Sequence, residues 1–319
     1  MNPVIVVGAG ISGIACARVL AEAGLLVRVL DRGHRIGGRM AVQSSTGRPV
    51  DIGASYFTVS DCRFEELVLD WHRRGLARPW TDTFEVYDGA AVSRRSTGPL
   101  RWAATGGLRS LVEDLADAAG LSLERADVEL VDSADGLRVD GRRAAAVVLA
   151  MPDPQARALL GPARTGERAG LYAGFEPVLA LSAGWPERRW NRLDGMFVHG
   201  DEWLSWIADD GSRRGDGAAV LVAHSTPAFA AERLEGPQSA AEPMLRALRA
   251  VLEIDSAPSW TRLHRWSYAR PVTGRAVSFQ LWPSLIGACG DGWSQRPRVE
   301  AAFLSGLQLG QALAARLGG

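Results

Sequence analysis

Three glycines near the start of the chain have the spacing of a turn that binds a dinucleotide. They follow an apolar run at residues 3–7 and precede a helical pattern at residues 11–23. The first glycine of such a turn allows a tight bend, the second lets the backbone approach a pyrophosphate, and the third lets the helix pack on the sheet. The helix N-terminus then presents N–H groups to the phosphates. The expected contacts are Gly8, Gly10, Ile11, Ser12 and Gly13.

Positions further along the chain extend this phosphate site. Asp31 ends the second apolar run, where a carboxylate can bind the adenosine ribose hydroxyls, and Arg32 follows it. Gly37 and Gly38 would let a loop come close to the nucleotide, and Arg39 could contact the pyrophosphate through charge-assisted hydrogen bonds. An ordinary surface turn is the alternative interpretation of this loop. The first fingerprint alone does not separate NAD from FAD.

A glycine–acid pair near the other end of the chain narrows the choice of nucleotide. Gly290 and Asp291 follow a short apolar run at residues 285–288 that predicts a buried strand. A carboxylate there can accept hydrogen bonds from the ribityl hydroxyls of a flavin. A helix that begins near Arg298 and Val299 would direct its positive dipole end toward the ring, where negative charge gathers on reduction. The two signatures together predict FAD.

The pattern of helical and strand-like segments predicts an α/β chain with a discontinuous, Rossmann-type nucleotide domain and a second domain rich in tryptophan. The nucleotide domain is expected to comprise residues 1–55, 100–160 and 284–319, and the second domain residues 56–99 and 161–283. Helices are expected at residues 11–23, 64–75, 108–119, 240–252 and 299–317. Residues 33–47 are interpreted as a loop, and residues 209–217 as a turn between strands.

The bulk composition bounds the class of protein. A chain of 319 residues with 47% hydrophobic side chains is expected to be globular. The 36 basic and 36 acidic side chains cancel, and neither gathers in a tail, so no nucleic-acid or membrane partner is expected. The basic side chains are all arginine. The chain therefore offers no lysine as a base or a Schiff-base nucleophile.

Cysteine and histidine usage points to a reducing compartment without a metal centre. Cys16, Cys62 and Cys289 have no paired spacing, and the five histidines show no metal-ligand spacing. Cys289 is interpreted as a small core residue. The first apolar run is too short to span a membrane and has no cleavage site after it. A cytoplasmic location and no metal site are expected.

These motifs together make the chain resemble the FAD-dependent amine-oxidase superfamily, and within it most closely the bacterial renalase-type NAD(P)/FAD-dependent oxidoreductases. The resemblance covers essentially the whole chain and is carried, beyond the glycine motifs, by residues 51–58, 264–271, 290–293, 298–302 and 305–306. It implies a glutathione-reductase-like FAD domain beside a substrate domain with a mixed β-sheet. It also implies non-covalent FAD, oxidation of 2- or 6-dihydro isomers of NAD(P)H, and reoxidation by oxygen to give hydrogen peroxide.

The resemblance also implies further site residues. Gly53, Ala54 and Ser55 are expected to contact the flavin, and the Val128 backbone is expected to contact adenine.

Hydride transfer to a flavin requires a substrate pocket with aromatic walls and a few polar groups, and it requires no general base. Tyr56 and Trp266 are the candidates for catalytic positions in such walls, and Trp206 is a further candidate. An ordinary half-buried aromatic residue is the alternative for each.

Several alternatives stay open. An amine oxidase or a specialised-metabolism oxidase or desaturase is the second hypothesis, although amine oxidases usually carry a lysine that holds a water near the flavin. A non-catalytic flavin-binding redox protein is the third. Arg270 and Arg275 could meet a substrate anion, with a surface salt bridge the expectation for Arg275. His224 and His264 are interpreted as structural.

Overall fold

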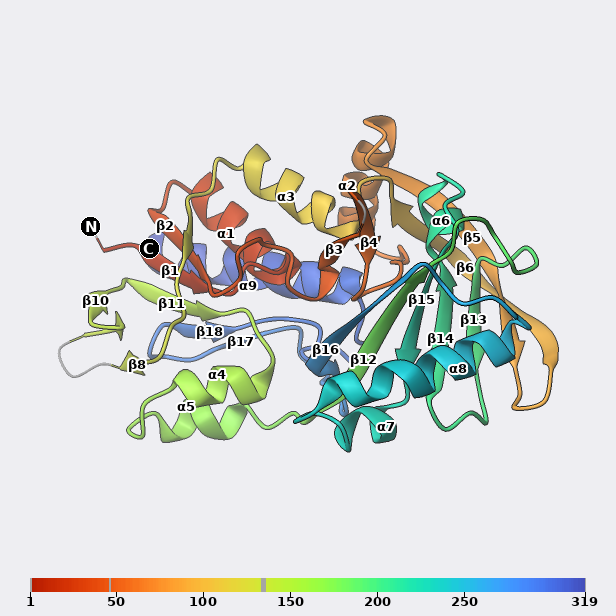
Figure 1. Ribbon diagram of the computed structural model, residues 1–319. Helices are drawn as coiled ribbons and strands as arrows, with labels where there is room; N and C mark the ends of the chain where they lie inside the picture. Colours follow the sequence, from red (N-terminus) through yellow and green to blue (C-terminus); the bar gives the residue numbers. More distant parts are fainter. Residues whose placement is uncertain (1, 46, 133–135, 319) are drawn as a thin grey trace. The chain divides into compact units, whose positions relative to one another are not determined.

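The structure is a computed structural model that describes residues 2–45, 47–132 and 136–318 (Figure 1). The chain divides into two compact units, and each is made of separate stretches of sequence. Unit 1 contains Met1–Met40, Arg109–Phe175 and Arg270–Gly319, and unit 2 contains Ala41–Leu108 and Glu176–Ala269. Residues 41–55 and 100–108, which the sequence pattern placed with the nucleotide domain, lie in unit 2. The assignment of one domain to nucleotide binding and of the other to substrate binding stays a prediction.

Unit 1 is built on a six-stranded sheet in the order β17-β18-β11-β1-β2-β7. Its strands are β1 (Val4–Val7), β2 (Val27–Asp31), β7 (Leu123–Arg125), β11 (Ala146–Leu149), β17 (Gln280–Leu281) and β18 (Ile286–Ala288). All neighbours pair in parallel except β17 and β18. Every residue of β1 and β11 is buried, as is usual for parallel strands covered on both faces. This confirms the predicted Rossmann-type α/β class.

Two helices of unit 1 lie side by side against this sheet (Figure 1). They are α1 (Ile11–Glu22) and α9 (Val299–Gly318). A Cβ added at Gly306 of α9 would lie 1.9 Å from the carbonyl oxygen of Ser12, and one at Gly310 would lie 2.9 Å from that of Cys16. Glycines one turn apart on α9 therefore allow the two helix backbones to approach closely.

The remaining elements of unit 1 are small. A three-stranded sheet joins β8 (Val131–Asp132), β9 (Arg138–Val139) and β10 (Arg142–Arg143). The helices are α3 (Leu108–Ala118, beginning at the last residue of unit 2), α4 (Asp153–Leu159) and α5 (Thr165–Gly170), with a 3₁₀ turn η1 (Gly38–Met40). Residues 33–47 are thus not only loop. They contain η1 and also β3 of unit 2, because glycine and arginine content does not exclude a short hairpin strand.

Unit 2 is built on a mixed seven-stranded sheet in the order β16-β12-β15-β14-β13-β5-β6. Its strands are β5 (Ala77–Tyr87), β6 (Val92–Ala104), β12 (Phe175–Gly184), β13 (Gly195–Val198), β14 (Leu204–Asp209), β15 (Val220–Ser225) and β16 (Trp260–Pro271). β13 pairs in parallel with β5, whereas β5–β6, β12–β15, β13–β14 and β14–β15 are antiparallel. A hairpin of β3 (Val42–Ser45) and β4 (Arg48–Asp51) accompanies the sheet. The predicted mixed sheet is confirmed.

The two faces of this sheet have different partners, because successive side chains of a strand point to opposite faces. On one face, residues such as Met196 and Ile207 pack with α8 (Ala241–Val251), which crosses the strands in Figure 1. The other face carries an aromatic cluster around Phe84 and Trp206. The remaining helices of unit 2 are α2 (Cys62–Arg73), α6 (Asp210–Arg214), α7 (Pro227–Ala231) and the 3₁₀ turn η2 (Pro237–Ala240).

Helix α6 corrects the interpretation of residues 209–217 as a plain turn between strands. The segment between β14 and β15 is a short helix whose Asp210, Arg213 and Arg214 are buried. Among the residues that the structure describes, no helix is long and apolar enough to cross a membrane.

Candidate active site

The first glycine turn of unit 1 depends on the absence of side chains at two positions. Gly8 has a φ of +104°, and a Cβ there would lie 2.6 Å from the carbonyl oxygen of Ala150. A Cβ on Gly13 would lie 1.9 Å from the carbonyl oxygen of Gly8. Gly10 is the N-cap of α1 and supplies no side-chain cap. The turn therefore has the close strand–helix packing that a dinucleotide fingerprint requires.

The second glycine motif lies directly against the first. The N–H of Gly37 donates to the carbonyl oxygen of Ala9 at 2.8 Å. A Cβ on Gly38 would lie 3.2 Å from the Cα of Gly10, so any larger residue would push the two loops apart. Segments that the sequence predicted to share one ligand thus share one place in unit 1.

Asp31, at the end of β2, forms hydrogen bonds that stabilise the first glycine turn. One carboxylate oxygen accepts from the N–H of Ala9 and the other from the N–H of Gly33, each at 2.7 Å. Each oxygen keeps further lone-pair capacity, so the carboxylate can still accept hydrogen bonds from a ligand hydroxyl. Arg32 beside it is exposed.

A pocket opens at the carboxyl ends of β11 and β18. Its walls come from α1, η1 and the segments that follow β11 and β18. The lining residues are Ser12, Arg39, Ala150, Met151, Pro152, Asp153, Phe175, Cys289, Gly290, Asp291, Gly292 and Trp293. In open parallel sheets, ligands bind at the carboxyl ends of the strands, at the point where the strand order reverses. In this sheet the order reverses at β1, which has β2 on one side and β11 on the other.

Arg39 and Asp291 form an ion pair in this pocket. One guanidinium nitrogen of Arg39 donates to Asp291 Oδ2 at 3.0 Å, and a second donates to Oδ1 at 2.5 Å. The Arg39 guanidinium also lies 5.7 Å from the centroid of the Phe175 ring. A bidentate pair fixes the orientation of both groups. The ion pair joins the loop after Gly38 to the segment after Gly290, across 252 residues of sequence.

The backbone beside Asp291 leaves room where a side chain would stand. Gly290 has a φ of +142°, and a Cβ there would meet only Ser12 Oγ, at 4.0 Å. The N–H of Gly290 donates to the buried Ser305 Oγ at 2.9 Å, which ties this turn to α9. Cys289 is fully buried, and burial raises the pKa of its thiol to about 12 despite a hydrogen bond with Ser12.

The other predicted contacts of unit 1 flank these groups. Val299 begins α9, and Arg298 before it donates to the buried Glu300 at 2.6 Å. Val128 is buried in the core beside the sheet. The segment after it is held by Asp140, whose Oδ1 accepts from the N–H of Leu130 at 2.9 Å.

Gly10, Gly38 and Gly290 form a glycine cradle, which together with the pocket fits a dinucleotide. Backbone approaches at Gly10, Gly38 and Gly290 leave space that a Cβ would fill, and the first turn of α1 faces that space without a side-chain cap. Such a cradle suits a pyrophosphate, since N–H groups and a helix dipole neutralise its charge. Arg39 and Asp291 add a cation for phosphate and a carboxylate for hydroxyls.

The predicted residues of unit 2 gather on the aromatic face of its sheet. Ser55 Oγ accepts from the indole N–H of Trp206 at 2.9 Å. The Tyr56 ring lies 5.3 Å from Phe84 and 5.9 Å from Trp206, centroid to centroid. Burial raises the pKa of the Tyr56 hydroxyl, and the neighbouring Arg101 partly offsets that rise. Tyr56 is therefore a neutral phenol at physiological pH.

Trp266 also contacts the segment that carries Gly53, Ala54 and Ser55. Its indole N–H donates to the carbonyl oxygen of Ile52 at 2.9 Å. The His264 ring meets Trp266 edge-on at 4.4 Å, and burial, with a smaller effect of Arg265, lowers the pKa of His264.

The expectation of a surface salt bridge at Arg275 is wrong. Arg275 is 4% exposed and pairs with Asp153, and its guanidinium lies 3.8 Å from the centroid of the Trp293 ring. Its burial could not be predicted from the local sequence, because the partner carboxylate lies 122 residues away.

Two residues that line the pocket were not predicted from the sequence. Met151 and Asp153 line it, and a Pro-Asp-Pro run directly after a buried strand was the available signal, since ligand sites collect at such strand ends. The buried charges of α6 gave no comparable signal.

Comparisons with known proteins give the family. The model of the flavin-containing amine oxidoreductases matches residues 72–306, and that of the NAD(P)-binding Rossmann-like domain matches residues 6–69. Renalase of Mus musculus is 25% identical over 340 aligned positions, 92% of this chain and 94% of that protein. Probable polyamine oxidase 4 of Arabidopsis thaliana is 57% identical over 53 residues, 17% of this chain and 11% of that protein.

Solved structures share the fold. A putative protoporphyrinogen oxidase from Exiguobacterium superposes with a TM-score of 0.79 at 13% identity, with 99% of each chain covered. Cyclohexylamine oxidase from Brevibacterium oxydans superposes with a TM-score of 0.75 at 16% identity, with 100% of each chain covered. The chain belongs to the flavin-containing amine oxidoreductase family and is an FAD-dependent oxidoreductase.

Proposed function

We propose that the protein is an oxidase that takes hydride from a reduced, nicotinamide-like substrate, the 2- or 6-dihydro isomers of NAD(P)H. The observation that carries this proposal is the extent of the similarity to renalase, which spans 92% of this chain. The similarity to polyamine oxidases is higher in identity but covers only 53 residues. A shared nucleotide turn accounts for a match of that length.

The proposed reaction balances without a protein base. The substrate C–H bond breaks, hydride leaves with both electrons, and the dihydropyridine becomes an aromatic pyridinium. Bound FAD supplies the two-electron acceptor. Oxygen then takes the two electrons, the hydrogen from the substrate as a proton and one further proton from solvent, and leaves as hydrogen peroxide. The chain needs to hold the substrate carbon in place and to exclude water, which aromatic walls such as Tyr56 and Trp266 would do.

The same proposal assigns the predicted cofactor contacts. Gly8, Gly10, Ile11, Ser12 and Gly13 would hold the pyrophosphate with Gly38 and Arg39. Asp31 and Arg32 would lie at the adenosine ribose, and Val128 at adenine. Gly53, Ala54, Ser55, Gly290, Asp291, Arg298 and Val299 would contact the flavin half. The FAD would be non-covalent, which agrees with the buried thiol of Cys289 and its pKa of about 12.

Oxidation of an amine is the second candidate, and the polyamine oxidases among the similar proteins favour it. The chain has no lysine for the water-holding role that the family resemblance would assign to one. A peroxide assay in air separates the candidates. We expect peroxide from a dihydronicotinamide isomer and none from putrescine, spermine or cyclohexylamine. Peroxide from an amine alone would contradict the proposal.

A further inference from the structure

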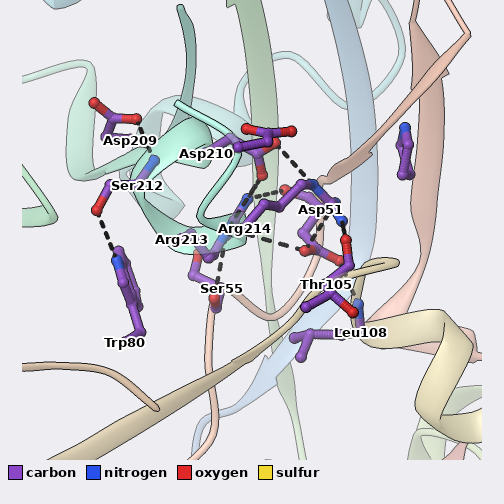
Figure 2. Close-up of polar contacts among 12 residues, drawn as sticks. Asp51, Ser55, Trp80, Thr105, Leu108, Asp209, Asp210, Ser212, Arg213 and Arg214 are labelled. Carbon is purple, nitrogen blue, oxygen red and sulfur yellow. Dashed lines mark hydrogen bonds and ion pairs between the residues drawn. The ribbon is translucent and has the colours of Figure 1, made fainter. Parts of the chain in front are cut away.

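Helix α6 carries three charged side chains into the interior of unit 2. They are Asp210, Arg213 and Arg214. The helix begins after Asp209, whose Oδ1 accepts from the N–H of Ser212 at 2.9 Å, and it ends at Gly215 with a φ of +80°. Figure 2 shows that the helix faces the segment that follows β4.

The charges of α6 are balanced by Asp51, the last residue of β4. Arg214 donates to Asp51 Oδ2 at 3.0 Å and to Asp210 Oδ2 at 3.1 Å. Arg213 donates through Nε to Asp210 Oδ1 at 3.1 Å, and Arg48 pairs with Asp210 from the rim. Burial raises the pKa of Asp210, but the three arginines outweigh it and lower that pKa to about 2.

One of these arginines also holds a stretch of backbone. Arg213 donates to the carbonyl oxygen of Asp51 at 3.0 Å and to that of Ser55 at 3.2 Å (Figure 2). Ser55 lies outside helices and strands, so a sheet ladder does not satisfy its carbonyl group, and Asp51 is the last residue of β4. The other oxygen of Asp51 accepts from the N–H of Leu108 at 2.8 Å. Both ends of the segment are therefore fixed from the interior.

Stability alone is a weak reason for such a cluster. Buried ion pairs stabilise a fold little compared with apolar side chains of the same volume, because each charge loses its hydration. An arginine adds geometry, since its planar guanidinium presents five N–H donors in fixed directions. Arg213 uses them to hold two carbonyl groups and one carboxylate at once.

We propose that Arg213 is a positioning residue, which holds residues 51–56 in the form that the flavin site requires. Asp210 and Arg214 act with it by fixing its guanidinium and the Asp51 carboxylate. The inference rests on the proposed function, in which Gly53, Ala54 and Ser55 contact the flavin and Tyr56 lines the substrate site. It extends that function to α6, a helix that contains none of the predicted cofactor contacts.

The test replaces Arg213 by lysine, which keeps the charge and loses the planar fork. We expect Arg213→Lys to fold and to bind FAD, because the glycine turns of unit 1 are unchanged. We expect the visible circular dichroism of the bound flavin to change. The rate of flavin reduction per bound FAD should fall tenfold or more, with a smaller change in substrate KM.

Arg249→Lys is the matched control within unit 2. Arg249 also holds backbone carbonyl groups, since it donates to the carbonyl oxygen of Ile254 at 3.0 Å and to that of Asp255, in the segment after α8. The control should keep both the flavin spectrum and the reduction rate. An Arg213→Lys protein with an unchanged flavin spectrum and an unchanged rate per bound FAD would overturn the inference. So would equal losses in Arg213→Lys and the control.

A second variant covers the case in which Arg213→Lys does not fold. Asp210→Asn keeps the side-chain volume and removes the charge that orients Arg213, so the same two readouts should move in the same direction. Asp210→Asn with wild-type readouts would reject the positioning role. The flavin spectrum needs no substrate. If dihydronicotinamides fail to reduce the wild type while Arg213→Lys still alters that spectrum, the proposed substrate is wrong and the positioning role stands.

Discussion

At the scale of single residues, the predicted contact between the segment after β18 and the flavin ribityl chain depends on Asp291. Its carboxylate is held by Arg39 inside the pocket. We expect Asp291→Ala to weaken FAD binding about 10- to 150-fold, because a hydrogen bond to a charged group contributes roughly 1.5–3 kcal/mol. Reconstitution of the apoprotein, followed by flavin fluorescence, measures the dissociation constant. Wild-type affinity in this variant would contradict the role given to Asp291.

The acidity of Tyr56 gives a second prediction for one residue. Burial raises the pKa of its hydroxyl, and Arg101, whose guanidinium lies 6.0 Å from the ring centroid, opposes that rise. Arg101→Met removes a positive charge that stabilises the phenolate, so the pKa of Tyr56 should rise further. Ultraviolet titration of tyrosinate, with Tyr56→Phe subtracted, reports that pKa.

Arg95→Met serves as the control for this titration. Arg95 lies on the same strand, is largely exposed and pairs with Glu85. Its removal should leave the Tyr56 titration in place. A lower pKa of Tyr56 in Arg101→Met would show that the electrostatic account of this pair is wrong.

At the scale of elements, the contact between α1 and α9 links the stability of unit 1 to its glycine turn. A Cβ on Gly306 would lie 1.9 Å from the carbonyl oxygen of Ser12, whereas one on Gly318 of the same helix meets nothing within 4 Å. Gly306→Ala should lower the free energy of unfolding by roughly 1–3 kcal/mol through overpacking. It should also weaken FAD binding, because Ser12 lies at the pocket.

Gly318→Ala is the matched control, since it adds the same methyl group to the same helix. It should be neutral or raise the free energy of unfolding by up to about 1 kcal/mol through helix propensity. Urea unfolding measures both variants. Equal effects of the two substitutions would mean that the close approach of α1 and α9 contributes nothing.

Element by element, the sequence predicted local structure better than buried charge. The β1-α1-β2 run could be predicted because its signals all lie within one short stretch of sequence. They are an apolar run, glycines at fixed spacing and a second apolar run. Helix α6 could not. Its Asp and Gly residues favour a turn locally, and the partner that makes its arginines a buried cluster, Asp51, lies 163 residues from Arg214.

At the scale of the whole molecule, the same distinction holds for the site. Arg39 and Asp291 were each predicted from residue type and strand position, but their mutual ion pair depends on tertiary structure that joins distant motifs. Tyr56 and Trp266 were predicted as pocket walls from what hydride transfer to a flavin requires. The structure adds that Trp266 contacts Ile52 and that Trp206 contacts Ser55. Both tryptophans therefore hold the segment that carries Tyr56.

Anaerobic mixing of the holoprotein with the 2- and 6-dihydro isomers of NAD(P)H, and separately with amines, tests the proposed substrate class while the flavin absorbance is followed. We expect rapid bleaching by at least one dihydronicotinamide isomer, followed by one hydrogen peroxide per flavin when air is readmitted. Bleaching by amines alone, or by none of these compounds, would show that the proposed substrate class is wrong.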